Sequence, residues 1–282
     1  MSRILLTGAT GFVGRQILAH LLSQGAEVDV VVRRGKPAPQ GVASVHVTDD
    51  LFAEDEAFWR NACDGIDTLV HAAWYAVPGK YVTSPKNLAC MTGTIRMAEW
   101  AAAAGVKRFV GVGTCFEYDL DAGYLKTSTP LVPTTPYGAA KAATYLALSR
   151  ALPGLGLSFA WCRLFYLYGE GEDPRRLVPY LHDCLAMGTP AELSSGDQVR
   201  DYMDVAEAGR RIAEVALSSG QGAFNISTGV PQTVRQLAES IADAYGRREL
   251  LRFGARPDRP DDPKCVIGEP TPITTPASEE RT

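Results

Sequence analysis

Cysteine and histidine are sparse in this sequence, and neither falls into a metal-binding or disulfide pattern. Six cysteines and four histidines are scattered along 282 residues, and no two cysteines form a C-x-x-C pair. Zinc sites and small disulfide frameworks are built from closely spaced cysteines and histidines. We therefore expect no metal site and six reduced thiols, which are typical of a cytoplasmic protein.

A long apolar run and an excess of one charge are also missing. No segment approaches the roughly 20 apolar residues of a membrane-spanning helix, and the apolar stretch in Met1–Thr7 is too short for a signal peptide. Lys and Arg number 28 against 32 Asp and Glu, with both signs interspersed. Because the charges are balanced, we expect no nucleic-acid partner. Because a long apolar run is missing, we expect no membrane partner.

Short strand-like segments alternate with longer helical ones in the first part of the chain. The predicted strands are Arg3–Thr7, Glu27–Val32, Ser44–Val47, Thr68–His71, Arg108–Val112 and Ser158–Cys162, and the predicted helices are Phe12–Gln24, Ala53–Ala62, Pro85–Ala104 and Tyr137–Ala151. This β-α-β order indicates an α/β fold with a Rossmann-type, doubly wound parallel sheet that helices cover on both faces. We assign residues 1–168 to this dinucleotide-binding domain.

The alternation loosens after about Gly169. Three helices and two short strands are predicted there: Arg175–Met187, Asp204–Ser218, Val234–Tyr245, Ala223–Ile226 and Leu250–Phe253. We expect residues 169–273 to form mainly a smaller C-terminal α/β lobe that binds substrate on the carboxyl ends of the sheet. Residues 274–282 are expected to be a loose tail.

A glycine-rich turn follows the first predicted strand. Gly8, Gly11 and Gly14 have a G-x-x-G-x-x-G spacing, and a helical pattern follows them. Glycines at such a strand–helix turn let the backbone approach a pyrophosphate, which the helix N-terminus then binds. The sequence therefore predicts a dinucleotide site on this loop, which also contains Thr10, Phe12 and Val13.

The end of the second predicted strand indicates which dinucleotide is preferred. An acidic residue there would bind the ribose hydroxyls of NAD, whereas this chain has Arg33 and Arg34. Guanidinium groups bind a 2′-phosphate, so we expect NADP (NADPH) to be preferred over NAD, although a solvated basic pair is the alternative. Asp50, followed by Leu51, is placed to accept a hydrogen bond from adenine or is simply an exposed turn residue.

Three residues form a candidate catalytic set. Tyr137 and Lys141 are four apart at the start of a predicted helix and share one face. A nearby ammonium lowers a tyrosine pKa, and the lysine can also hold the nicotinamide ribose. Thr114 follows the fifth predicted strand, and its hydroxyl can orient a carbonyl or an alcohol.

These motifs give the chain a family resemblance from Arg3 to about Ile273. It resembles an extended short-chain dehydrogenase/reductase of the NAD(P)-dependent epimerase/dehydratase type. The matching positions are Gly8–Gly14, Asp50-Leu51, His71-Ala72-Ala73, Gly93-Thr94, Thr114 with Tyr118, Tyr137 with Lys141, Arg163–Gly169, Arg200–Tyr202 and Phe224–Ile226. The resemblance implies cofactor contacts at Ala72 and Ala73.

The resemblance also implies a nucleotide-sugar site in the second half. Arg200 would meet the substrate diphosphate, unless it pairs with Asp201 at the surface, and Arg259 with Asp262 would lie near the nucleotide. Tyr166 stands where the family has an asparagine on the substrate.

One departure from the family pattern argues against one of the family's reactions, the elimination of water. Nucleotide-sugar 4,6-dehydratases have Asp-Glu after the active-site threonine, whereas Cys115 and Phe116 occupy these positions here. A cysteine and a phenylalanine cannot supply that acid–base pair, so a dehydratase is not expected.

The sequence thus predicts an NADPH-dependent reductase of a nucleotide-linked keto sugar, of the 4-keto-6-deoxyhexose type. Tyr137 would donate the proton, Thr114 would bind the carbonyl oxygen and Lys141 would hold Tyr137 and the ribose. A sugar C4-epimerase with retained NAD(P), a reductase of a small non-nucleotide carbonyl compound and a non-catalytic NADP sensor are the alternatives.

Two predicted helices are apolar around most of their circumference. Pro85–Ala104 and Tyr137–Ala151 are both rich in alanine and other apolar residues, whereas a helix on a sheet needs only one apolar stripe. We therefore expect a homodimer in which two helix pairs form a four-helix bundle. The alternative is that the small lobe or the loop Asp119–Thr135 covers this face.

Overall fold

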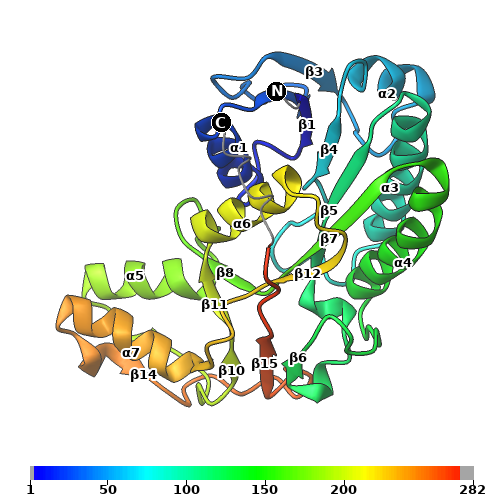
Figure 1. The fold of residues 1–282 in the computed structure, drawn as a ribbon. Coiled ribbons are helices and arrows are strands. Elements are labelled where there is room, and N and C mark those ends of the chain that lie inside the picture. Colours follow the sequence, from blue (N-terminus) through cyan, green and yellow to red (C-terminus); the bar gives the residue numbers. More distant parts are fainter. Residues whose placement is uncertain (1–2, 274–282) are drawn as a thin grey trace, which may run out of the picture.

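The computed structural model describes residues 3–273, and its centre is a seven-stranded sheet (Figure 1). The strand order is β12-β7-β5-β4-β1-β2-β3, and all neighbouring strands are parallel. The strands are β1 (Arg3–Thr7), β2 (Glu27–Arg33), β3 (Ser44–Thr48), β4 (Thr68–His71), β5 (Arg108–Thr114), β7 (Ser158–Leu164) and β12 (Gly222–Ile226). The predicted doubly wound parallel sheet is confirmed.

Helices cover both faces of this sheet. Helices α1 (Gly14–Ser23) and α6 (Val205–Leu217) lie on one face, and α2 (Glu56–Ala62), α3 (Lys86–Ala103) and α4 (Pro136–Ala151) lie on the other. Successive side chains of a strand point to opposite faces. Accordingly Ile4 and Leu6 of β1 are buried with α1 and α6 on one face, while Leu5 is buried with α2, α3 and α4 on the other face.

Helix starts follow local capping chemistry. Asp55 accepts a hydrogen bond from the Phe58 N–H and begins α2, and Thr135 accepts one from the Gly138 N–H and begins α4. The first helix begins at Gly14, two residues later than predicted, because the glycine turn extends to Val13.

The remaining elements form a smaller unit beside the carboxyl ends of the main strands. Its four-stranded sheet has the order β13-β10-β15-β6, and two strand pairs, β8 with β11 and β9 with β14, accompany it. The strands are β6 (Tyr124–Leu125), β8 (Tyr166–Tyr168), β9 (Ala191–Glu192), β10 (Val199–Arg200), β11 (Tyr202–Asp204), β13 (Gln232–Thr233), β14 (Leu251–Arg252) and β15 (Cys265–Gly268). Helices α5 (Leu177–Met187) and α7 (Val234–Tyr245) pack on each other within it.

The two units exchange segments of chain. Helix α6 and strand β12 come from the second half of the sequence yet belong to the main layers, whereas β6 comes from the first half and pairs with β15. A substrate lobe that begins at residue 169 therefore stays a prediction. The predicted tail, residues 274–282, lies outside the described residues.

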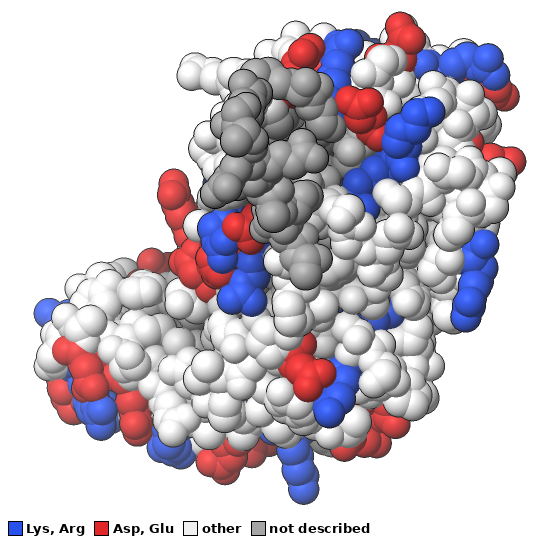
Figure 2. Space-filling model, viewed as in Figure 1, with Lys and Arg blue, Asp and Glu red and all other residues white. Residues whose placement is uncertain are grey.

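The surface and the helices add two further facts. Acidic and basic side chains are interspersed on the face that Figure 2 shows. Within residues 3–273 no helix combines the length and the apolar character that crossing a bilayer requires.

Candidate active site

The glycine turn after β1 has no room for side chains at two positions. Gly8 has a φ of +78°, and a Cβ atom on it would lie 2.7 Å from the Ala73 nitrogen and 2.8 Å from the Ala72 carbonyl carbon. A Cβ atom on Gly14 would lie 2.0 Å from the Gly8 carbonyl oxygen. The turn therefore packs directly against the chain that follows β4, which places Ala72 and Ala73 at the predicted dinucleotide site.

The N-terminus of α1 is free to bind an anion. Val13 caps the helix without a side-chain hydrogen bond, and no described residue accepts a hydrogen bond from the N–H groups of Phe12 and Val13. Thr10 and Gly11 of the same turn are exposed. Unpaired N–H groups at a helix N-terminus are suited to a phosphate, so these residues fit the pyrophosphate of a dinucleotide.

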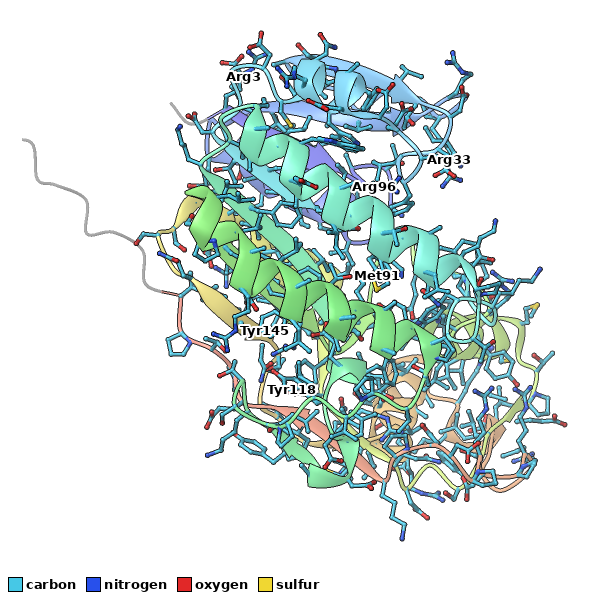
Figure 3. All side chains as sticks on the ribbon, turned by 90° about the vertical axis from the view of Figure 1, so that its right-hand side faces the viewer. Arg3, Arg33, Met91, Arg96, Tyr118 and Tyr145 are labelled. Atoms are coloured by element: carbon cyan, nitrogen blue, oxygen red, sulfur yellow. The ribbon has the colours of Figure 1, made fainter. Side chains whose placement is uncertain are left out.

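The two arginines after β2 have different surroundings. The Arg34 Nε atom lies 2.6 Å from the Asp49 Oδ1 atom, and both side chains are exposed. Arg33 has no ion pair among residues 3–273 and projects outward at the edge of the molecule in Figure 3. Arg33 is therefore the more available of the two for a phosphate. Asp50 accepts a hydrogen bond from the Phe52 N–H in an exposed turn, and Leu51 is half-buried against the core.

The predicted catalytic residues converge at the carboxyl end of β5. Thr114 is the last residue of that strand, and the Lys141 Nζ atom of α4 donates a 2.5 Å hydrogen bond to the Val112 carbonyl of β5. Lys141 is only 3% exposed, and its ammonium lies 3.8 Å from the centre of the Trp74 ring. The Tyr137 ring has edge-to-face contacts with Tyr81, Trp74 and Phe116.

Burial governs the titration of this set. It raises the pKa of Tyr137 above the ordinary tyrosine value, so the lowering expected from the nearby ammonium is wrong; only the Thr114 hydroxyl opposes this effect, by hydrogen bonding. Burial also lowers the pKa of Lys141 to about 7, and the negative charge of Glu117 opposes this effect. The phenol therefore stays protonated near neutral pH, which is the form that donates a proton.

A buried ion pair beneath the site was not predicted from the sequence. The carboxylate of Glu117 is 0% exposed and accepts hydrogen bonds from the Thr114 N–H at 2.8 Å, the Trp161 indole at 2.9 Å and Arg163 Nε at 2.7 Å. Thr114 and Glu117 form a capping box at the start of a 3₁₀ turn, Cys115–Glu117. The Thr-x-x-Glu spacing is a sequence signal of that motif and could have identified Glu117.

The motif residues His71 and Thr94 have a structural role. The two ring nitrogens of His71 lie 2.7 Å from the Thr7 hydroxyl and 3.0 Å from the Thr94 hydroxyl. Burial holds the pKa of His71 well below its ordinary value, so the ring is neutral. The chain of hydrogen bonds connects β1, β4 and α3 beside the glycine turn.

Neither residue that follows Thr114 is placed to act as an acid or a base. Cys115 is buried with Tyr118, Leu125, Phe165 and Val266, and burial raises the pKa of its thiol to about 12. The Phe116 ring has edge-to-face contacts with Tyr137 and Tyr166. Phe116 therefore contacts both the predicted catalytic residue Tyr137 and the predicted substrate residue Tyr166.

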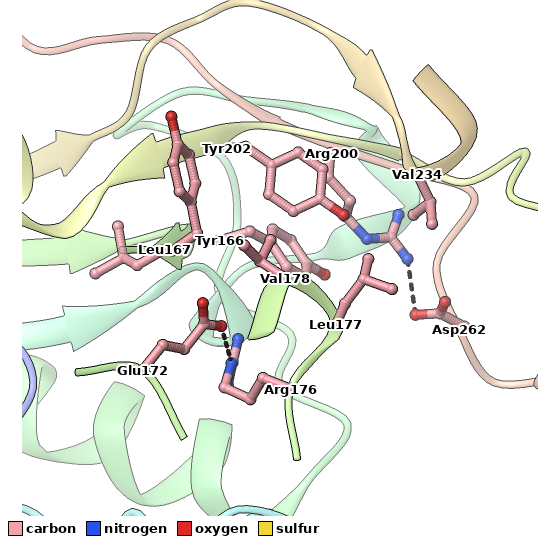
Figure 4. Close-up of a pocket in the computed structure, with 11 residues that line it drawn as sticks. Tyr166, Leu167, Glu172, Arg176, Leu177, Val178, Arg200, Tyr202, Val234 and Asp262 are labelled. Carbon is pink, nitrogen blue, oxygen red and sulfur yellow. Dashed lines mark hydrogen bonds and ion pairs between the residues drawn. The ribbon is translucent and has the colours of Figure 1, made fainter. Parts of the chain in front are cut away.

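A cavity of about 200 Å³ opens beside Tyr166 (Figure 4). It is lined by Tyr166, Leu167, Tyr168, Glu172, Arg176, Leu177, Val178, Arg200, Tyr202, Val234 and Asp262. Arg200 is 3% exposed, lies over the Tyr166 ring and pairs with Asp262 at 2.7 Å. The alternative pairing with Asp201 is wrong, because Asp201 instead accepts hydrogen bonds from the Thr228, Gly229 and Gly268 N–H groups.

Arg259 lines an adjoining cavity of about 380 Å³. The two cavities share Arg176, Leu177, Val234 and Asp262, so their walls are continuous. Arg175 and Arg256 also line the second cavity. The predicted substrate residues Arg200 and Arg259 therefore lie in neighbouring cavities whose combined lining has five arginines and three carboxylates, Glu172, Glu192 and Asp262. Arg176, which the sequence analysis did not single out, borders both.

The arrangement of histidine, cysteine and acidic side chains bears on metal binding and on disulfides. No group of three or more His, Cys, Asp or Glu side chains in residues 3–273 is arranged to hold a metal ion. All six cysteines are free thiols.

Comparison with known proteins places the chain in a family. A profile of the "NAD dependent epimerase/dehydratase family" matches residues 4–227. A dTDP-6-deoxy-L-talose 4-dehydrogenase (NAD(+)) of Aggregatibacter actinomycetemcomitans is 25% identical over 94% of this chain and 98% of that protein. A dTDP-6-deoxy-L-talose 4-dehydrogenase (NAD(P)(+)) of Kitasatospora kifunensis is 30% identical over 87% of this chain and 80% of that protein.

A solved structure agrees in fold. The UDP-glucose 4-epimerase of Thermus thermophilus, in complex with NAD, is 27% identical and has a TM-score of 0.78 over 95% of this chain and 90% of that one. The chain therefore belongs to the NAD dependent epimerase/dehydratase family and is an enzyme of the extended short-chain dehydrogenase/reductase type.

Proposed function

We propose that the protein is an NADPH-dependent reductase of a nucleotide-linked keto sugar, of the 4-keto-6-deoxyhexose type. When bound, the dinucleotide supplies the hydride that reduces the carbonyl carbon. Tyr137 delivers a proton to the carbonyl oxygen, and the Thr114 hydroxyl orients that oxygen. Lys141, held by the Val112 carbonyl, positions Tyr137 and the ribose.

The convergence of Thr114, Tyr137 and Lys141 at the carboxyl end of β5 is the observation that carries this proposal. A reductase needs a proton donor at the carbonyl oxygen, whereas oxidation of an alcohol needs a base there. Burial raises the pKa of Tyr137, which keeps the phenol in the donating form. Cys115, with its pKa raised to about 12, and Phe116 supply no second acid–base group for a dehydratase.

The substrate class is supported by the two adjoining cavities and by the relatives. Arg259 has no ion pair among residues 3–273 and supplies a guanidinium group that suits a diphosphate, beside Arg176 and Arg200, which pair with Glu172 and Asp262. Two relatives are named for oxidation of a 6-deoxyhexose at C4, and the reverse of such a reaction is reduction of a 4-keto-6-deoxyhexose. A C4-epimerase is the second candidate, because the similar Thermus thermophilus structure is a UDP-glucose 4-epimerase.

The experiment is incubation of the protein with NADPH and a panel of nucleotide-linked 4-keto sugars and 4-hydroxy sugars. A reductase consumes one NADPH per keto sugar, seen as loss of absorbance. Interconversion of 4-hydroxy sugars without net consumption would instead establish an epimerase. Tight NADPH binding with no turnover of any sugar would identify a sensor and contradict the proposal.

The cofactor preference gives a testable expectation for Arg33 and Arg34. Replacing both with alanine removes the charge-assisted bonds to a 2′-phosphate, which are worth about 1.5–3 kcal/mol each. We expect NADPH affinity to fall at least about tenfold, with NADH affinity nearly unchanged. The single variants should differ, since Asp49 already pairs with Arg34: Arg33→Ala should cause most of the loss. Fluorescence titration with each dinucleotide measures this, and an unchanged preference for NADPH in the double variant would refute the assignment.

We further propose a homodimer formed through α3 and α4, which lie side by side in Figure 3. This pair exposes apolar residues together with charged ones: Leu88 is 62% exposed and Leu146 is 53% exposed, and Ala139, Ala143 and Ala147 of α4 are exposed, while Arg96 and Glu99 of α3 are exposed as well. Residues 119–135 leave the middle of α4 uncovered, since Ala143, Leu146 and Ala147 are exposed. A two-fold copy of this face would complete a four-helix bundle.

Light scattering at low micromolar concentration tests the dimer. The unaltered protein should have about twice the 30.3 kDa chain mass. Ala143→Glu places a charge in the centre of the exposed face and should give the monomer mass. Trp100 is a poorer choice, because its ring also packs against the core. Met187→Glu, on an exposed apolar residue of α5, is the control and should stay dimeric.

The remaining proposals concern domain roles and location. We propose that residues 169–273 supply most of the substrate contacts, with α6 and β12 excepted because they complete the main layers. The six free thiols support a cytoplasmic location.

A further inference from the structure

Glu117 occupies an unusual position for a carboxylate. Its side chain is fully buried beneath the carboxyl end of β5. This strand ends with Val112, Gly113 and Thr114. A carboxylate in such a place needs several partners to offset the loss of water. Its two oxygens have them: the Thr114 N–H, the Trp161 indole and Arg163.

The first consequence concerns Thr114. Glu117 accepts from the Thr114 backbone N–H, while the Thr114 hydroxyl accepts from the Phe116 N–H at 3.3 Å. Together these bonds fix both the backbone and the side chain of Thr114. The hydroxyl hydrogen is left free to point toward Tyr137 or a substrate oxygen.

The second consequence concerns Lys141. Its ammonium lies 5.6 Å from the centre of the Trp161 ring, whose indole N–H donates to Glu117. The Lys141 ammonium also donates a hydrogen bond to the carbonyl of Val112, which lies two residues before Thr114. The buried carboxylate and the buried ammonium thus lie against the same end of β5.

The other titratable groups that face Lys141 are neutral near neutral pH. They are His71 of β4, Cys90 of α3 and Tyr137 of α4. Burial lowers the pKa of His71 and raises the pKa of both Cys90 and Tyr137. Among the described residues, Glu117 is therefore the anion that acts on Lys141.

We propose that Glu117 is a positioning residue for the catalytic set: it fixes Thr114 through the backbone and supplies the buried negative charge that keeps Lys141 in its ammonium form. This inference rests on the function proposed above, in which Thr114 and Lys141 act at the carbonyl. Arg163 is the second member of the unit, because its Nε atom donates to Oε2 of Glu117, whereas the Thr114 N–H donates to Oε1, and its guanidinium packs between the rings of Tyr118 and Tyr145.

The test measures the charge of Lys141 directly, without substrate or cofactor. The chain has seven lysines, so protein labelled with ¹³Cε-lysine gives few NMR signals, and the Lys141→Arg variant identifies the signal of Lys141. In the unaltered protein this signal should titrate with a midpoint near neutral pH. In Glu117→Gln, which keeps the shape of the side chain, the midpoint should fall by about one pH unit or more.

The direction of the change separates this role from a merely structural one. A loosened interior would admit water, relieve the burial of Lys141 and raise its midpoint toward the ordinary lysine value. Loss of a counter-charge lowers the midpoint. An unchanged or raised midpoint in Glu117→Gln would overturn the proposal.

A second variant covers the case in which Glu117→Gln does not fold. The double variant Glu117→Gln with Arg163→Gln removes the ion pair as a unit and leaves no unpaired charge. Because Glu117 and not Arg163 acts on the charge of Lys141, the Lys141 midpoint of the double variant should also lie below that of the unaltered protein, and an equal or higher one would contradict the proposal. Asp29→Asn is the matched control: Asp29 is a buried carboxylate 2.9 Å from Arg3 Nη2, in β2, and its loss should leave the midpoint unchanged.

Kinetics test the Thr114 half of the proposal and separate it from the proposed function. With a reducible sugar in hand, Glu117→Gln should lower kcat and kcat/KM together, because the lost positioning acts on the transition state. A change in KM alone would refute this half. If no sugar is reduced but the Lys141 midpoint falls as expected, the proposed reaction fails while the charge relation between Glu117 and Lys141 stands.

Discussion

Tyr137→Phe is expected to bind NADPH as tightly as the unaltered protein and to reduce a keto sugar about 10²–10⁴ times more slowly, since a positioned general acid contributes about that factor. Only a hydroxyl is removed, and the aromatic contacts of Tyr137 with Tyr81, Trp74 and Phe116 need only the ring. The fold and the cofactor loop should therefore be unaffected. Stopped-flow loss of NADPH absorbance measures the rate, and fluorescence titration measures the affinity.

A matched control distinguishes this effect from a general consequence of losing a phenol. Tyr124→Phe removes the same group from an exposed position in β6 and should leave the rate unchanged. Turnover of Tyr137→Phe near that of the unaltered protein would mean that another group protonates the product. Cys115 is poorly suited to that role, because burial raises the pKa of its thiol to about 12.

Gly113→Ala is expected to destabilise the fold by about 3–5 kcal/mol, through overpacking and the loss of hydrogen bonds to a buried charge. A Cβ atom on Gly113 would lie 2.2 Å from the Trp161 indole nitrogen and 2.4 Å from the Glu117 Oε1 atom. Both atoms belong to the buried unit beneath Thr114, so neither can move without breaking a hydrogen bond. Urea unfolding followed by circular dichroism measures the change.

Gly154→Ala provides the comparison for this substitution. A Cβ atom on Gly154 meets no heavy atom within 4 Å, and replacing such a glycine restricts the unfolded chain. Gly154→Ala should therefore leave stability unchanged or raise it slightly. Equal urea midpoints for Gly113→Ala and the unaltered protein would show that the space beside β5 is not closed as described.

The parts of the fold that depend on short-range pattern were predictable. Alternating strand and helix patterns predicted the parallel sheet, and the glycine spacing predicted the turn before α1. Strand ends were less predictable. Strands β5 and β7 each continue two residues beyond their predicted ends, to Thr114 and Leu164, because tertiary pairing extends them.

Pairings between distant residues could not be predicted from the sequence. Arg200 was expected on a diphosphate or paired with its neighbour Asp201, yet its partner is Asp262, 62 residues away. Arg163 pairs with Glu117, which is 46 residues away. No periodicity relates such residues, because only the packed strands bring them together. The Thr-x-x-Glu spacing at Thr114 is one local signal in the sequence, because it predicts the capping box that Thr114 forms with Glu117.

The exchange of segments between the two units has a consequence for how the chain folds during synthesis. Strand β12 is the edge partner of β7, and α6 packs over α1, but both are made after much of the smaller unit. Until residue 226 has emerged, the edge of β7 that pairs with β12 is open. The face of the sheet that α1 and α6 cover has only α1 until α6 has been made. Contacts between residues so far apart form slowly, and open strand edges invite aggregation. The nascent chain is therefore most in need of a chaperone while residues 165–226 are being translated.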